Sequence, residues 1–172
     1  MRRREYLIAT PVVAALSAML LAAPAYAEES NPAALAAAVA GVPTTLEKGL
    51  QASESAGKPI SGKFEIEDGK LQLSVYTLAK DSYNEVVVAP DTGNVVKTEK
   101  ITDTDDLKSA TEEKAAMEKA TRTLVAATER AVQRNSGSRA VSIFPELKGG
   151  LPMASVTLLR DGKLTTVSEK LD

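Results

Sequence analysis

The sequence predicts an α+β fold made of two copies of a helix plus a three-stranded antiparallel β-meander, preceded by a signal peptide. Three observations lead to this prediction. A phrase recurs eighty residues later, where Phe64 falls on Phe144; the helical stretches begin with capping residues; and apolar residues alternate with polar ones between turn signals. The predicted division is residues 1–27 as signal peptide, 28–102 as first repeat and 103–172 as second repeat.

The N-terminal stretch has the three parts of an export signal. The arginines at positions 2–4 are cationic, residues 7–23 are apolar, and residues 25–27 read Ala-Tyr-Ala, the small-x-small pattern of a cleavage site. The alternative, a membrane anchor, is disfavoured by Pro11 and by that closing pattern. We therefore expect cleavage after Ala27 and a periplasmic or secreted protein without a membrane anchor. The export route stays open, because RREYL also resembles a twin-arginine signal.

The remaining composition narrows the possible partners. Removing three Arg and one Glu with the leader leaves about 145 residues with 18 basic and 22 acidic side chains, a net charge of −4. Such a surface has no electrostatic reason to bind nucleic acid or anionic lipid. The remaining aromatic residues are too scattered for a base-stacking platform; they are Phe64, Tyr76, Tyr83 and Phe144.

Cysteine and histidine are both absent from the sequence. This excludes Ser-His-Asp and Cys-His catalysis, zinc sites of the usual ligand types and haem held through histidine. With no cysteine after the cleavage site, a bacterial lipid anchor is excluded as well. We expect no catalytic residue, no cofactor-binding residue and no metal ligand, so the protein is not expected to be an enzyme.

Each repeat is expected to begin with a helical stretch. In the first, Asn31 caps a helix that starts at Pro32, residues 41–43 interrupt it, and a second piece over residues 44–56 ends at Gly57. In the second, residues 103–105 offer N-caps for a longer helix that ends at residues 135–137. A break or bend is expected near residues 119–123. One apolar stripe is expected along this helix, comprising Leu107, Ala110, Met117, Leu124, Ala131 and Val132.

Three strands are expected to follow each helix, because short alternating runs are separated by turn residues. In the first repeat the runs cover residues 64–67, 71–77 and 85–89, with a further short strand at 95–96. In the second they cover residues 140–147, 153–160 and 163–170. One such sheet buries little apolar surface alone, so two copies facing each other would bury both apolar faces. Whether the copies join one sheet or stack as layers stays open.

Three segments of the chain resemble the PepSY family. They are GKPISGKFEIEDGKLQLSVYTL (57–78), YNEVVVAPDTGNVV (83–96) and LPMASVTLLRDGKLTTVSEKL (151–171). The chain departs from the family in two places: Ala89-Pro90 precedes the Asp of the Thr-Gly hairpin, and the second copy lacks that hairpin. The resemblance implies tandem PepSY-like repeats, an exported non-catalytic binding module, and a protein or peptidase partner that is recognised or inhibited. The alternative is a carboxylate-based binding protein for a small ligand or metal ion at the helix–sheet seam.

Two groups of acidic residues invite a more specific reading. Asp91-Thr92-Gly93 is the tripeptide of aspartic proteases, but the second copy has no counterpart, so only a homodimer could pair two aspartates. A β-turn, with local bonding by Asp91 and positive φ at Gly93, is favoured instead. Asp103, Asp105 and Asp106 suggest calcium, with Glu112 and Glu113 downstream, yet a capped helix start is favoured because the loop lacks the central Gly of an EF-hand.

The other charged residues of the strands are expected to be solvated. Glu65, Glu67 and Asp68 are predicted on an exposed sheet face. Lys80, Arg160 and Lys163 are predicted near hairpin tips, where charge discourages edge-to-edge pairing.

Overall fold

The structure is a computed structural model that describes residues 31–80 and 82–172. The described residues form helices α1 (Pro32–Ala40), α2 (Leu46–Ser53), η1 (Glu54–Ala56), α3 (Thr104–Lys119) and α4 (Leu124–Arg134). Their strands are β1 (Lys58–Glu67), β2 (Lys70–Ala79), β3 (Ser82–Val88), β4 (Val95–Lys100), β5 (Arg139–Lys148), β6 (Leu151–Arg160) and β7 (Lys163–Lys170). The predicted signal peptide, with its cleavage after Ala27, lies outside these residues.

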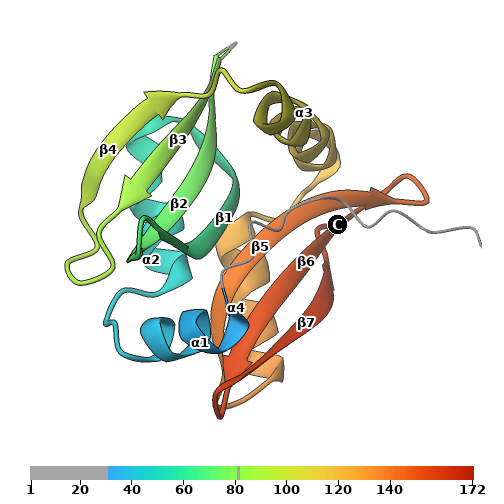
Figure 1. Ribbon diagram of the computed structural model, residues 1–172. Coiled ribbons are helices and arrows are strands. Elements are labelled where there is room, and N and C mark those ends of the chain that lie inside the picture. Colours follow the sequence, from blue (N-terminus) through green and yellow to red (C-terminus); the bar gives the residue numbers. More distant parts are fainter. Residues whose placement is uncertain (1–30, 81) are drawn as a thin grey trace, which may run out of the picture.

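All seven strands belong to one antiparallel sheet in the order β4-β3-β2-β1-β5-β6-β7 (Figure 1). The fold is α+β, but the prediction of two copies, each a helix with a three-stranded meander, is wrong. The first half contributes four strands, and each half contributes two α-helices. The halves join edge to edge because β1 and β5 would otherwise expose unpaired backbone groups.

The junction between β1 and β5 is short. Gly62 pairs with Ile143 and Lys63 with Ser142. The two strands diverge beyond this point, and α3 packs in one opening against β1, β5 and β6. In the other opening α1 packs against β1, β2 and β7 (Figure 1). The helices therefore cover apolar surface that a short strand pairing leaves open.

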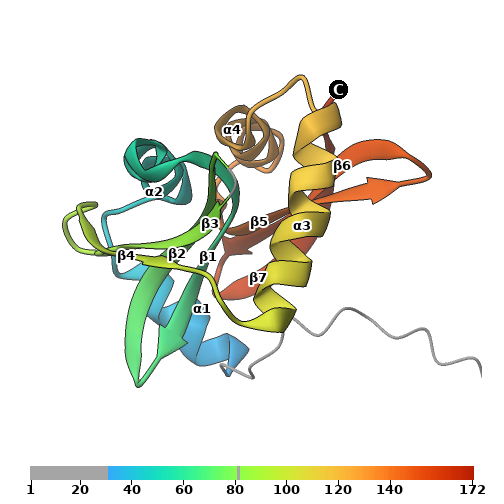
Figure 2. The same ribbon diagram turned by 90° about the horizontal axis from the view of Figure 1, so that it is seen from above.

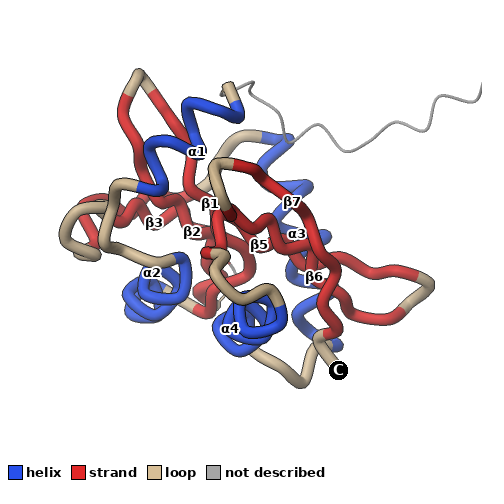
Figure 3. Tube along the Cα trace, turned by 90° about the horizontal axis from the view of Figure 1, so that it is seen from below, coloured by secondary structure: helices blue, strands red, loops and turns tan. Residues whose placement is uncertain are grey.

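The helices lie on both faces of the sheet. Figures 2 and 3 show α2 and α4 on one face, and α1 and α3 on the other. The α2–α4 face holds the main core, where an added Cβ at Gly49 would lie 2.1 Å from a methyl carbon of Leu73. Fully buried residues such as Leu46, Leu50 and Val156 belong to this core. Two facing sheets are unnecessary because helices already cover both faces.

The strands of the two halves correspond at an offset of 81 residues. Lys58 pairs with Leu78, whereas Arg139 pairs with Leu159, and a bulge follows one residue later in each hairpin. The predicted offset of eighty is thus wrong by one residue, and a slip of one residue reverses the face of every strand side chain.

Phe64 and Phe144, which the offset of eighty matched, consequently lie on opposite faces of the sheet. Phe64 is 2% exposed and shares its face with Gly62, which packs against α2. Phe144 lines a cavity beneath α3.

The predicted break between residues 119 and 123 is confirmed. Helix α3 ends at Lys119, Ala120 is extended with φ −72° and ψ 136°, and Thr123 caps α4 by accepting from the amide of Ala126. The amides of Thr121 and Arg122 donate to the carbonyl of Leu171, at 2.8 and 2.9 Å. These two amides therefore do not donate to helix carbonyls, and the break between the two helices allows α3 and α4 to lie on opposite faces of the sheet. The single stripe expected along one long helix is therefore divided between them.

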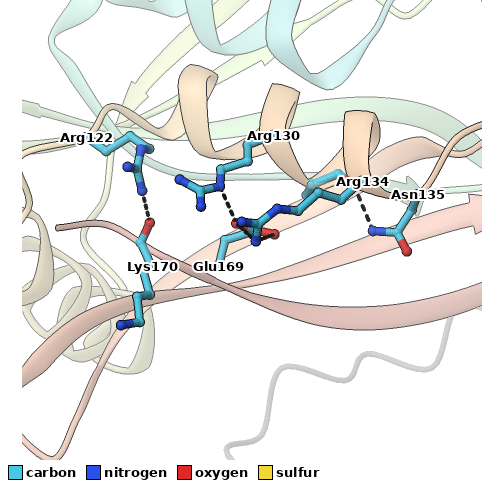
Figure 4. Close-up of polar contacts among 7 residues, drawn as sticks. Arg122, Arg130, Arg134, Asn135, Glu169 and Lys170 are labelled. Carbon is cyan, nitrogen blue, oxygen red and sulfur yellow. Dashed lines mark hydrogen bonds and ion pairs between the residues drawn. The ribbon is translucent and has the colours of Figure 1, made fainter.

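Glu169 of β7 forms ion pairs that link α4 to the sheet (Figure 4). Its carboxylate is 4% exposed and lies 3.5 Å from Nε of Arg130 and 3.4 Å from a terminal nitrogen of Arg134. Both guanidinium groups remain partly in water, so the pair avoids the full desolvation cost of two buried charges.

We expect Glu169→Ala to lower the free energy of unfolding by about 1–3 kcal/mol, because it removes a desolvated partner of two cations. Urea titration measures the effect. The matched control is Glu99→Ala, which breaks the exposed pair with Lys97 and is expected to change nothing measurable. Equal stability of the two variants would contradict this prediction.

Candidate functional site

The Asp91-Thr92-Gly93 tripeptide lies in the connection between β3 and β4. Gly93 has φ +76°, as the turn prediction requires, and its amide donates to the carbonyl of Ala89 at 2.8 Å. The local side-chain bond comes from Thr92, whose Oγ1 accepts from the amide of Asn94 at 3.3 Å, rather than from Asp91 as predicted. Local hydrogen bonds of this kind account for the turn geometry.

The aspartates at the start of α3 form a helix cap. Asp103 Oδ1 accepts from the amides of Asp105 and Asp106, at 2.9 and 3.2 Å. This satisfies two donors that the first helical turn leaves without partners. Within residues 31–80 and 82–172, no group of three or more acidic, histidine or cysteine residues is arranged to hold a metal ion.

The polar residues predicted on the sheet surface are found there. Glu67 and Asp68 are exposed, and half-buried Glu65 pairs with Lys63 at 2.6 Å. Gln72 of β2 donates to both Glu65 and Glu67. The cations predicted near hairpin tips are also exposed in the structure and lie at or next to strand ends; they are Lys80, Arg160 and Lys163.

A cavity of about 450 Å³ lies between α3 and the β5–β6 hairpin, and we call it the seam groove. In Figure 2, α3 crosses in front of β5, with β6 beside it. Phe144, Pro145 and Leu147 supply apolar surface, and Ser155 donates a hydrogen bond to Glu146 at 2.7 Å. The complete lining is Glu112, Glu113, Ala115, Phe144, Pro145, Glu146, Leu147 and Ser155.

Glu113 is the chemically unusual member of this lining. The residue is 3% exposed, and its Oε2 accepts a 2.7 Å hydrogen bond from Ser61 of β1. Its Oε1 is also buried but has no hydrogen-bond partner among the described residues. Burial raises the pKa of Glu113 to about 8, although Ser61 and Lys63 act in the opposite direction. At neutral pH this side chain is therefore mainly a neutral carboxylic acid.

A second, smaller cavity of about 40 Å³ lies behind Glu113, between α3 and the strands β1 and β2. Tyr76, Asp106 and Lys63 contribute to its lining, and Phe144 and Glu113 line both cavities. Burial raises the pKa of Tyr76, and the charge of Asp106 and a hydrogen bond with it add to the shift. The volume of this smaller cavity is enough for about one water molecule. Glu113 therefore lies between this smaller cavity, which we call the inner chamber, and the seam groove.

Sequence reasoning named Glu113 only as an acid downstream of the helix cap. The spacing contained a contrary signal, because Ala110 and Met117 precede and follow Glu113 by three and four residues. These spacings put all three on one helix face, and the structure buries all three. An acidic residue on the apolar face of a predicted helix was therefore the sequence signal that could have indicated this site.

Glu146 is held differently from Glu113. Its carboxylate accepts from Ser155 and pairs with Lys148 at 2.9 Å. Burial tends to raise its pKa, but these two partners outweigh it, and the pKa of Glu146 is lowered overall. In the groove, Glu146 is therefore an ionised, partnered carboxylate, whereas Glu113 is a neutral, incompletely partnered carboxyl group.

Comparisons with known proteins leave the family open. No family model matches the chain, and no curated protein matches it. Among solved structures, the chain is similar to a Clostridium difficile 630 protein described as "a putative lipoprotein", at 16% identity and a TM-score of 0.33. The similarity covers 68% of this chain and 87% of that one. So distant a likeness carries no argument, and the PepSY resemblance stays a prediction.

Within the described part of the chain, none of the helices is long and apolar enough to cross a membrane.

Proposed function

We propose that this chain is a non-catalytic, cofactor-free binding protein that holds a basic segment of a partner protein in the seam groove. The observation that carries the proposal is the pairing of apolar walls with acidic groups in one cavity. Glu112, Glu113 and Glu146 are acidic, and none of the described lining residues is basic. The cavity volume, about 450 Å³, falls within the range of ligand pockets.

The groove chemistry fits a lysine or arginine side chain flanked by apolar residues. The aliphatic stem of such a side chain would contact Phe144 and Ala115, and its charged end would lie near the carboxyl groups. Leu147 is 39% exposed and Leu151, at the hairpin tip, is 55% exposed. Leu151 pairs with Lys148 and therefore lies on the same face of the hairpin as Glu146, whereas Leu147 lies on the opposite face. Leu151 extends the apolar surface beyond the groove and supports an extended segment rather than an isolated side chain. A peptidase as the partner follows from the PepSY resemblance and is part of this proposal.

A small amine is the second candidate, since an ammonium group on an apolar stem presents the same chemistry. It is the form that a carboxylate-based small-ligand protein would take here, and the incompletely partnered Glu113 favours it. Parallel titrations with n-pentylamine and with a lysine peptide distinguish the two candidate ligands, a small amine and a protein segment. Tighter binding of the peptide supports a protein partner, whereas equal affinities favour the small amine.

We expect Ala115→Leu to weaken binding at least about tenfold, because the larger side chain occupies the groove from α3. The probes are fluorescein-labelled pentapeptides with a central Lys or Arg flanked by Leu, Val or Phe, and fluorescence anisotropy measures Kd. Ala126→Leu, at another half-buried helical alanine outside the groove, is the matched control.

A peptide with norleucine in place of the central lysine tests the role of charge, since it keeps the stem and removes the ammonium. It is expected to bind more weakly than the lysine peptide. Failure of every basic peptide to bind at millimolar concentration, or equal effects of the two alanine substitutions, would overturn the proposed function.

A further inference from the structure

Resting on the proposed function, we propose that a cation entering the seam groove displaces the proton of Glu113, so that binding releases a proton to the solvent. Glu113 has an incomplete set of hydrogen bonds. Buried carboxyl groups in folded proteins normally have partners for both oxygens. Ser61 donates a hydrogen bond to Oε2 of Glu113, whereas Oε1 is buried without a hydrogen-bond partner among the described residues.

The position of Glu113 makes it reachable from the groove. Its side chain lines the open cavity beside Phe144 and also the inner chamber beside Ser61. A donor brought into the groove by a ligand can therefore supply the interaction that Oε1 lacks. An ammonium or guanidinium group is suited to this role because it carries several donors and no acceptor.

The surrounding charges make Glu113 responsive to an added cation. On β1, Lys63 favours its ionised form, whereas Asp106 and Glu112 on α3 oppose it. Tyr76 of β2 faces the inner chamber, and Glu146 of β5, paired with Lys148, faces the groove. Acidic neighbours thus outnumber the basic ones, and burial holds the pKa of Glu113 at about 8. A cation beside the carboxyl group lowers that pKa.

The proton balance of the step is simple. Before binding, Glu113 is a neutral acid and the ligand carries its positive charge. In the complex, the carboxylate of Glu113 pairs with the cation, and its former proton passes to the buffer. No covalent bond other than the O–H bond of Glu113 breaks. Binding is consequently expected to tighten as the pH rises toward 8, by up to about tenfold per pH unit.

Isothermal titration calorimetry tests the inference with the best-binding lysine pentapeptide at pH 7. The binding enthalpy is measured in phosphate and in Tris, whose ionisation enthalpies differ, and its dependence on the buffer gives the number of protons released. We expect release approaching one proton for the unaltered protein. Glu113→Gln is expected to release none and to lose the pH dependence of Kd. Glu129→Gln changes an exposed glutamate of α4 outside the groove lining; it is the matched control and is expected to keep the release.

A second variant keeps the test decisive if Glu113→Gln folds poorly. The hydrogen bond from Ser61 lowers the pKa of Glu113, so Ser61→Ala is expected to increase proton release at pH 8.5 rather than remove it. Peptide binding with no proton release overturns this inference alone and leaves the proposed function standing. Release that disappears equally in Glu129→Gln also overturns it. Absence of any peptide binding overturns the proposed function, and this inference with it.

Discussion

The protein is expected to lose stability as the pH rises from 4.5 to about 8, and Glu113→Gln is expected to remove most of that loss. Below this window both the folded and the unfolded chain hold the proton of Glu113. Within it the unfolded chain gives up the proton while the folded chain keeps it, so rising pH favours unfolding. The expected slope is about 1 kcal/mol per pH unit.

Thermal melts at pH 5 and pH 8.5 measure this effect. The two proteins are expected to melt at similar temperatures at pH 5, where Glu113 is neutral like glutamine. At pH 8.5 the variant is expected to melt roughly 10 °C higher. Glu129→Gln, at an exposed glutamate of α4, is the matched control and is expected to follow the unaltered protein. Glu85, whose pKa is also raised mainly by burial, accounts for a remaining slope in the variant. Parallel pH profiles for all three proteins would contradict the assignment to Glu113.

Gly57→Ala is expected to lower the free energy of unfolding by about 3 kcal/mol or more, because it combines backbone strain with a steric clash. Gly57 has φ +150° and ψ 179°, a region that is essentially restricted to glycine. A Cβ there would lie 2.7 Å from the carbonyl oxygen of Leu78, a backbone atom that a side-chain movement cannot displace. Leu78 pairs with Lys58 at the start of the β1–β2 hairpin, so relief of the clash would disturb that pairing.

Gly69→Ala is the matched control for backbone strain. Gly69 has φ +73° but nothing lies within 4 Å of an added Cβ, so this change is expected to cost about 1 kcal/mol. Guanidinium titrations of both variants separate the two contributions. A Gly57→Ala protein as stable as the Gly69→Ala protein would show that the contact with Leu78 does not constrain the chain.

Turn and capping residues could be predicted because their chemistry is local. Asn31 caps α1, Asp103 caps α3, and Gly93 adopts the positive φ that its turn requires. The break before Leu124 was also predicted. Each of these features depends on bonds within a few residues, so neighbouring sequence contains the necessary information.

The groove could not be predicted in the same way. Ser61 and Glu113 are 52 residues apart, and they meet because α3 packs across β1 and β5. The expected offset of eighty matched Phe64 with Phe144, although the pleat places them on opposite faces. A strand register is fixed by its partner strand, and a difference of one residue decides whether Phe144 enters the core or the groove.

The sequence by itself determined an α+β chain without histidine or cysteine, with its caps, turns and most strand positions in place. Tertiary structure decided that the halves share one sheet and that α3 and α4 lie on opposite faces. It also decided that Glu113, named in the sequence only as an acid downstream of a helix cap, is buried beside a groove. The reason is physical: caps and turns form through local hydrogen bonds, whereas burial and the pKa of Glu113 depend on which distant surfaces exclude water.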